Sequence, residues 1–453
     1  MRTHLCDVLI VGAGPSGTHL ASLLGRSGLS VIILDKNPAG EAGASWVNGI
    51  PGWMLEASGL GKPEPEELHS AGARFTVIDP THQSQVSILA PFLMDIDMRA
   101  FGARLLKAVE NSPNIRVFHD TLVQDFELDS NGRPVMARSQ NACFKAQLFV
   151  DVSGLAAIVR KNTPFLKELC PVVEPTDLCR AAQEVRYIRD PYGALEFLEN
   201  HKAQSGEILS WVGVAGGFSL MRAQIAQDLK TINFLTGTRA LFGVPSGARL
   251  IQDFLTRNPW VGDKIFGGQR AIPLRYPYGN LVAPGVALLG DSACQIYSAH
   301  ASGVGIGLLA AKQLAVCVIK AAHQGIDIGS LSALWPYSAN FHKEYGLLLL
   351  SSDLMRRFSQ ILSPYEVHQM IAGGIMTEGM LKSSLLQQHP EISLGEFSRQ
   401  LRGLISAPAL AFRMGLLLTK IPKLLLALNQ YPDKPDLPKV LRYERRVMQC
   451  LQN

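Results

Sequence analysis

The sequence predicts an α/β protein with a parallel sheet, a second α+β domain with a mixed or antiparallel sheet, and a helical C-terminal region. Three observations predict this fold class. Consecutive apolar residues such as Val8–Val11 and Val31–Leu34 are typical of buried parallel strands. Between about Cys170 and Arg270 the pattern changes to alternating strands with intervening helices. From Leu331 onward the pattern is helical to the end.

A βαβ unit opens the chain. After the first apolar strand come the string Gly12-Ala13-Gly14-Pro15-Ser16-Gly17 and a helix with apolar residues at helical spacing over 18–26. The second strand follows and closes on Asp35. A strand, a GxGxxG turn, a helix and an acid at the end of the next strand together indicate a dinucleotide site. We therefore expect a Rossmann-like domain here.

The remaining elements follow in order. We expect a loop and a short helix over 41–61, strands over 73–78 and 85–89, a helix over 99–109, strands over 115–119 and 122–128 with a hairpin at Asn131-Gly132, a buried strand over 146–152, strands over 183–187, 209–214 and 218–222, a buried strand over 285–289, and a helix of small residues over 303–323. These changes of pattern divide the chain into a dinucleotide-binding domain (1–75, 99–168 and 273–328), a substrate domain (76–98 and 169–272) and a helical C-terminal region (329–453).

Composition narrows the class of protein. A chain of 453 residues suits two or three packed domains, and 47% hydrophobic with 18% charged residues is typical of a globular protein. A net charge of +5 spread over this length gives little reason to expect a nucleic-acid partner. The seven cysteines form no CxxC pair and no Cys/His cluster with zinc spacing, so we expect reduced thiols, a cytoplasmic location and no metal. The N-terminus runs directly into the glycine motif, so we expect no secretion signal, and no apolar run reads as long and charge-free enough to span a bilayer.

The glycine string predicts how the dinucleotide is held. Gly12 permits the tight turn, Gly14 lets the backbone approach the pyrophosphate, and Gly17 allows the helix to pack on the strand. The diphosphate then meets unpaired N–H groups at the positive end of the helix dipole, and Asp35 accepts hydrogen bonds from the ribose hydroxyls. The predicted contacts in this unit are Gly12, Gly14, Pro15, Ser16, Gly17, Asp35 and Lys36.

Two later segments separate FAD from NAD. The strings LFVDVSG (148–154) and VALLGDSA (286–293) resemble further fingerprints of the glutathione-reductase-type flavoproteins, in the branch of p-hydroxybenzoate hydroxylase, geranylgeranyl reductases and flavin-dependent halogenases. The resemblance covers about residues 6–325 and implies FAD as the cofactor, with the aspartate of the Gly-Asp pair holding the ribityl chain. It assigns that role to Asp291 and adds as cofactor contacts Asp151, Gly154, Gly290 and Arg99, the last from the segment DIDMR.

Small residues follow this Gly-Asp pair. A helix beginning near Gly303 aims its N–H groups at the pyrimidine edge of the flavin, where the reduced ring carries negative charge. We therefore expect Ser302, Gly303 and Val304 at the cofactor. His300 lies within this motif and is the catalytic candidate, as a proton donor near flavin N5; the alternative is that it bonds backbone or phosphate.

The absence of certain motifs distinguishes among the halogenase, hydroxylase and reductase branches. The segment HSAGARF (69–75) has no lysine of the halogenase kind, and ASGVGIG (301–307) replaces the GQGxN string of the hydroxylases. The resemblance to geranylgeranyl reductases remains, although their YxWxFP string is replaced by WVGVAGGF (211–218). It implies hydride transfer from reduced flavin to or from a carbon–carbon double bond of a small apolar, isoprenoid- or polyketide-like substrate. The alternatives are an oxygen-using monooxygenase, a halogenase, and a non-redox flavoenzyme of the carotenoid-cyclase type.

The electron donor and the tail leave alternatives open. The chain has no second dinucleotide fingerprint, so either NAD(P)H binds transiently or an external reductase supplies the electrons. The stretch 407–428 is apolar and carries Arg413, Lys420 and Lys423. One interpretation is an interfacial helix in peripheral contact with a membrane. The other is a helix that caps the substrate domain, which Pro422 favours because it breaks the stretch.

Overall fold

The computed structural model describes residues 2–452. A six-stranded sheet has the order β19-β20-β13-β2-β3-β9, and β2 (Val8–Val11) pairs in parallel with β3 (Val31–Leu34) and β13 (Leu148–Asp151). All residues of these three strands are buried, which explains their continuous apolar runs. The remaining strands are β9 (Ile115–Phe118), β20 (Val286–Leu288) and β19 (Val282–Ala283), the last antiparallel to its neighbour. The predicted parallel sheet is confirmed.

Helices pack beside this sheet. α1 (Pro15–Arg26) contacts both α3 (Met98–Glu110) and α8 (Val304–His323). A separate four-stranded sheet consists of β1 (Arg2–Leu5), β12 (Ala142–Lys145), β11 (Pro134–Ser139) and β10 (Val123–Leu128). In this second sheet the predicted hairpin turn is present, since the Asp129 N–H donates to the Arg133 carbonyl at 2.8 Å. Its strands other than β10 were not expected, because they are short and only partly apolar.

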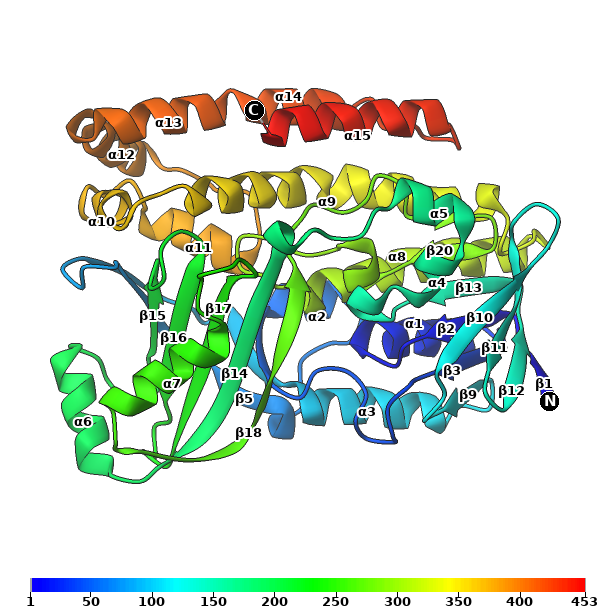
Figure 1. The fold of residues 1–453 in the computed structure, drawn as a ribbon, viewed down its shortest axis with the longest axis horizontal. Helices are drawn as coiled ribbons and strands as arrows, with labels where there is room; N and C mark the ends of the chain where they lie inside the picture. The colour runs from blue at the N-terminus through cyan, green and yellow to red at the C-terminus, as the bar shows by residue number, and fades with distance from the viewer. Residues whose placement is uncertain (1, 453) are drawn as a thin grey trace.

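A seven-stranded sheet forms the second layer, in the order β18-β14-β17-β16-β15-β6-β7 (Figure 1). All neighbours are antiparallel except β15 and β6. The predicted mixed sheet is therefore confirmed, but β17 and β18 were missed and β14 is much longer than expected. The bounds are β6 (Arg74–Ile78), β7 (Gln85–Leu89), β14 (Leu178–Ile188), β15 (Ile208–Val212), β16 (Ser219–Ile225), β17 (Thr231–Arg239) and β18 (Val261–Pro273), with α6 (Pro191–Asn200) and α7 (Gly247–Arg257) between strands.

A small three-stranded sheet lies where a loop was expected. β4 (Val47–Pro51) pairs with β8 (Leu93–Asp97), which also pairs with β5 (Leu68–Ala71). The prediction of a loop with a short helix over 41–61 was thus half wrong: α2 (Gly52–Ser58) is the helix, but β4 precedes it. Glycine and proline in VNGIP hid this strand, because both residues are rare inside strands. The domain boundaries stay predictions.

The C-terminal region is helical, as predicted, and lies along the upper edge of the molecule in Figure 1. The helical stretch over 407–428 breaks at Thr419, three residues before the expected break at Pro422. The proline instead occupies the first turn of a helix, where its missing N–H costs nothing. The helices are α9 (Leu331–Gln360), α10 (Pro364–Ala372), α11 (Glu378–Leu386), α12 (Leu394–Ser406), α13 (Pro408–Leu418), α14 (Lys420–Leu428) and α15 (Leu437–Gln452).

One expectation about membranes needs correction. One helix within residues 2–452, α8, is long and apolar enough to cross a bilayer by length and composition, whereas we expected no such run. Its alanines and glycines, and two lysines, concealed this in the sequence. In the structure, 67% of its most apolar window is buried, against α1, α2 and α9. A core helix satisfies the same length and composition criterion.

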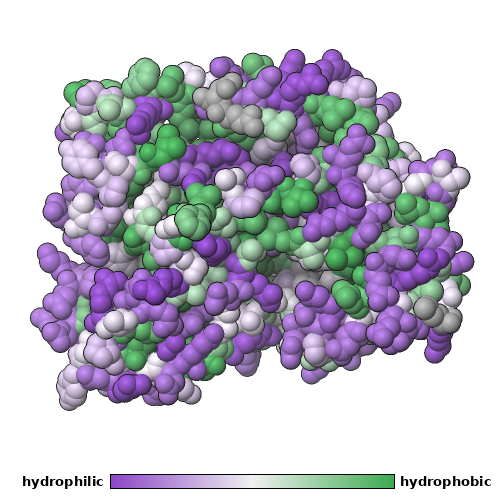
Figure 2. Space-filling view, viewed as in Figure 1, coloured by the Kyte–Doolittle hydropathy of each residue, from purple (hydrophilic) through white to green (hydrophobic). Residues whose placement is uncertain are grey.

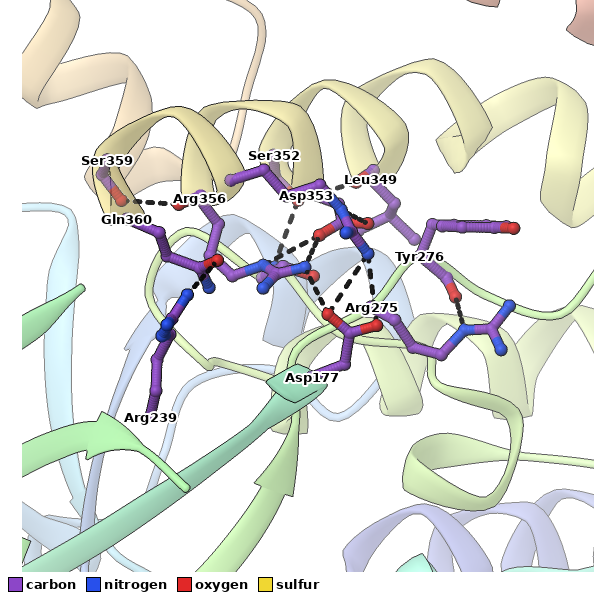
Figure 3. Close-up of polar contacts among 12 residues, drawn as sticks. Asp177, Arg239, Arg275, Tyr276, Leu349, Ser352, Asp353, Arg356, Ser359 and Gln360 are labelled. Carbon is purple, nitrogen blue, oxygen red and sulfur yellow. Dashed lines mark hydrogen bonds and ion pairs between the residues drawn. The ribbon is translucent and has the colours of Figure 1, made fainter. Parts of the chain in front are cut away.

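A polar cluster ties α9 to the seven-stranded sheet (Figure 3). Arg356 on α9 forms ion pairs with Asp353 on the same helix and with Asp177, which directly precedes β14 (Nη2 to Oδ1, 2.9 Å). Arg239, at the end of β17, donates to the Gln360 side chain at 2.7 Å. Arg356 and Asp353 are fully buried. The helical region is therefore fixed to the sheet by charges with almost no access to water.

Candidate functional site

The glycine turn shows which glycines the fold itself requires. Gly12 has φ +113°, and a Cβ there would collide with the Val152 carbonyl oxygen. A Cβ at Gly17 would collide with the Gly12 carbonyl oxygen. A Cβ at Gly14 would meet no atom within 4 Å, and its φ of −67° is open to any residue. Packing within the protein therefore explains Gly12 and Gly17, whereas the open space at Gly14 fits a ligand that approaches the backbone.

The first turn of α1 faces this open space. Gly14 is the N-cap without a capping side chain, Pro15 begins the helix, and the first turn holds no acidic residue. Its leading N–H groups lack intrahelical partners, and the helix dipole places partial positive charge there. Ser16 brings a second motif to this point, because its Oγ lies 3.9 Å from a Cβ built on Gly290. The turn thus suits a diphosphate.

Asp35 braces the turn from the neighbouring strand. Its Oδ2 accepts from the Ala13 N–H at 2.7 Å and its Oδ1 from the Asn37 N–H at 2.8 Å. The sequence showed the acid but not this support of the loop. Each oxygen keeps a lone pair for a ribose hydroxyl, so the predicted contact stays a prediction. The adjacent Lys36 is exposed.

Asp151 holds its own segment together. Its Oδ1 accepts from the Ser153 hydroxyl at 2.6 Å, and its Oδ2 accepts from the Arg160 N–H at 2.8 Å. The side chain is completely buried, and burial raises the pKa of its carboxyl group. We therefore expect Asp151 to hold the backbone of this segment in place and not to contact the cofactor directly. Gly154 stands in the turn that follows, with φ +65° and no atom within 4 Å of a built Cβ.

Asp291 presents a free carboxylate. It lies in the 3-10 turn Gly290–Ala293, and its side chain forms no hydrogen bond with any residue in 2–452. Its Oδ1 lies 3.2 Å from a Cβ built on Gly303, at the N-cap of α8. Burial raises the pKa of this carboxyl group to about 6. A desolvated carboxylate without partners suits the hydroxyl donors of a ribityl chain.

His300 is held by a helix that is distant in sequence. Its Nε2 lies 2.9 Å from the Ser384 hydroxyl of α11, and Gln387, just after α11, donates to the Ser302 hydroxyl at 3.1 Å. Burial lowers the pKa of His300 to about 4. The lowered pKa favours the neutral imidazole, which still carries one N–H donor, so both the proton-donor role of His300 and its hydrogen-bonding alternative stay predictions. No signal near Ser384 or Gln387 in the sequence pointed to this site.

Arg99 is held by neighbouring side chains, and its contact with the cofactor stays a prediction. Its Nη2 pairs with Asp97 at 2.6 Å, and its guanidinium carbon lies 3.3 Å from the ring centroid of Phe266 on β18. The structure thus gives it two partners within the protein. By contrast, the motifs around Gly14, Gly290 and Gly303 converge on one region, because Ser16 would also collide with a Cβ built on Gly307 of α8. These separated segments form one site at the N-terminal ends of α1 and α8.

Comparisons with known proteins identify the ligand of this site. Residues 5–43 match the family described as an FAD binding domain. The chain is an FAD-dependent oxidoreductase. It is 21% identical over 449 residues to the digeranylgeranylglycerophospholipid reductase of Sulfolobus acidocaldarius, across 95% of this chain and 94% of that protein.

Solved structures share the fold of this FAD-dependent oxidoreductase. A geranylgeranyl bacteriochlorophyll reductase-like protein of Thermoplasma acidophilum has a TM-score of 0.73 at 14% identity, over 92% of this chain and 100% of that one. The myxobacterial chondrochloren halogenase CndH has a TM-score of 0.59 at 15% identity, over 89% and 97%. These similarities agree with the predicted resemblance to FAD-dependent oxidoreductases of the reductase and halogenase branch.

We expect FAD to bind more tightly as the pH rises toward about 6, and the affinity to level off above that value. The hydroxyl donors that the resemblance assigns to Asp291 favour its ionised form, so binding lowers the raised pKa of this group. Affinity should then increase about tenfold for each unit by which binding lowers that pKa. Fluorescence titrations of apoprotein from about pH 5 to about pH 8 measure this change. Asp291→Asn should flatten the profile; an unaltered slope in this variant would contradict the assignment.

Proposed function

We propose that this oxidoreductase hydrogenates carbon–carbon double bonds of an isoprenoid lipid. The observation that carries the proposal is the relation to the archaeal digeranylgeranylglycerophospholipid reductase, which extends over 95% of the chain and therefore includes the C-terminal helices. Bound FAD, once reduced, supplies a hydride for such a reaction. The electrons come from NAD(P)H that binds transiently or from an external reductase.

The chain contributes orientation and exclusion of water. Helix α11 and the residues that follow it contact residues 300–304, called here the flavin segment, through His300 and Ser302. Beside these contacts, the Trp53 indole N–H donates to the Leu386 carbonyl at 2.9 Å. The neutral imidazole of His300 and the hydroxyl of Ser384 place an O–H or N–H donor in this enclosed region without burying a charge.

Two features argue against a halogenase and against a protein without a cofactor. The segment 69–75 holds no lysine to carry an activated halogen. The intact positions Gly14, Asp35, Gly290 and Asp291 argue for a bound cofactor, because Gly14 and Asp291 serve no packing purpose within the protein. Oxygen insertion and non-redox isomerisation remain as alternative outcomes of the same experiment.

Anaerobic reduction followed by substrate addition tests the proposal. The visible flavin band of the purified protein should bleach with dithionite or NAD(P)H and return when a geranylgeranyl phospholipid is added without oxygen. Mass spectrometry should then show a product with two additional hydrogens for each bond reduced. If the band returns only after oxygen is admitted and the product gains an oxygen atom, the protein is a monooxygenase; an isomeric product formed without consumption of reductant would indicate the non-redox alternative.

A further inference from the structure

The outer faces of α12, α13 and α14 carry many exposed apolar side chains. Nine of the 28 large apolar residues exposed within the described part of the chain lie between Leu394 and Leu426, with Leu394 90% and Ile405 72% exposed. Figure 2 shows apolar side chains at the upper left, over α12 and α13, with hydrophilic ones beside them. The nine are Leu394, Phe397, Leu401, Ile405, Phe412, Leu416, Leu418, Leu425 and Leu426, called here the outer face. Single exposed apolar residues are ordinary, but a concentration of this kind marks an interaction surface.

Helix α12 shows that this exposure is systematic. Leu394, Phe397, Leu401 and Ile405 recur at spacings of three and four, which places them on one side of the helix. The opposite side faces the protein: the Gln400 side chain donates to the Ile375 carbonyl at 3.2 Å. One side of α12 therefore packs on the protein. The apolar side has no partner among the described residues.

The charges beside the outer face are almost all positive. Between Leu394 and Leu426 the cations are Arg399, Arg402, Arg413, Lys420 and Lys423. The acidic residue in this range, Glu396, is turned inward and accepts from the Gly379 N–H at 2.9 Å. Among the described residues, only Arg413 of these cations forms an ion pair, with Glu366 at 2.9 Å. The neighbouring α15 adds exposed cations, namely Lys439, Arg442, Arg445 and Arg446.

We propose that the outer face docks onto a lipid bilayer with anionic headgroups. Apolar side chains flanked by lysine and arginine match the boundary between acyl chains and negative headgroups. The helices have 13, 11 and 9 residues, too few to span the hydrocarbon core, so they lie along its surface. A second copy of the chain fits less well, because a twofold interface would set these cations against themselves.

The docked face adjoins the flavin site. Helix α12 contacts α11 through Glu396 and Gly379, and α11 reaches the flavin segment through Ser384 and His300. Only α11 therefore separates the docked face from the flavin site, so a substrate that leaves the bilayer beside α11 would have a short path to that site. The docking itself does not depend on the proposed reaction, since vesicle binding is measured without turnover.

Vesicle cosedimentation of the holoprotein tests the proposal. The protein should sediment with vesicles of equal parts phosphatidylcholine and phosphatidylglycerol, and at least about tenfold more weakly with phosphatidylcholine alone. The variant Leu394→Glu/Phe397→Glu/Ile405→Glu should lose binding to the anionic vesicles by about tenfold or more. The matched control Tyr187→Glu/Tyr192→Glu replaces exposed aromatics on β14 and α6 and should bind as the original chain does.

Three results would overturn the proposal. They are absence of binding to anionic vesicles, equal binding by the triple variant, and a dimer in light scattering that becomes a monomer in that variant without any vesicle binding. Flavin absorbance and circular dichroism check that each variant is folded. Should the triple variant fail to fold, Arg402→Gln/Lys420→Gln/Lys423→Gln replaces it, with the same loss expected on anionic vesicles and no change on phosphatidylcholine.

Discussion

Gly14→Val should weaken FAD binding by roughly 100-fold or more, about 3 kcal/mol, while the stability of the apoprotein changes little. The side chain would fill the open space before the first turn of α1, where a built Cβ meets no atom within 4 Å. Because φ at this position is −67°, valine causes no backbone strain there. Flavin fluorescence titration measures the affinity, and thermal unfolding of the apoprotein measures the stability.

Two other glycines serve as controls for this result. Gly12→Val should unfold the domain, since φ is +113° and a Cβ collides with backbone. Gly415→Val, on α13 and also with no atom within 4 Å of a built Cβ, should change neither property. A yellow Gly14→Val protein with unchanged affinity would show that the diphosphate lies elsewhere. Loss of apoprotein stability in that variant would show that the space is not open in solution.

The parallel sheet could be predicted because burial on both faces leaves a local mark. Val8–Val11 and Leu148–Asp151 have every residue buried, so the sequence shows continuous apolar runs. β18 (Val261–Pro273) leaves no such mark, because its buried and exposed residues do not alternate and it contains three glycines. Its place depends on pairing with β14, a tertiary contact that no local pattern reports.

The candidate site likewise contains residues that a local sequence pattern indicates and residues that only the fold brings together. The glycines before the first turns of α1 and α8 could be singled out because they belong to local sequence strings, and their contact with the cofactor stays a prediction. Ser384 and Gln387 were missed because they lie about 85 residues from their partners, in or directly after a short helix that carries no site motif. The environment of His300 was missed for a related reason, since its depressed pKa results from burial that only the complete fold produces.

Arg356→Met should lower the free energy of unfolding by about 3–5 kcal/mol. This is the largest loss of stability that we expect from the removal of a single charged side chain. The guanidinium is fully buried between Asp353, also fully buried, and Asp177 (Figure 3). Its removal leaves the Asp353 carboxylate in a dry environment with Arg357 as its remaining cationic partner, at 3.3 Å. Urea unfolding of the apoprotein, followed by tryptophan fluorescence, measures the loss.

A second variant determines where that cost arises. Arg356→Met/Asp353→Leu removes both buried charges, and it should recover most of the stability because an apolar pair of similar volume packs without desolvating a carboxylate. Arg138→Met is the surface control: its pair with Glu127 is 41% and 47% exposed, so less than about 1 kcal/mol should be lost. If the double variant is no more stable than Arg356→Met, the ion pair between Arg356 and Asp177 holds α9 to the seven-stranded sheet. Recovery would instead mean that packing joins the two layers and that the charges chiefly neutralise one another.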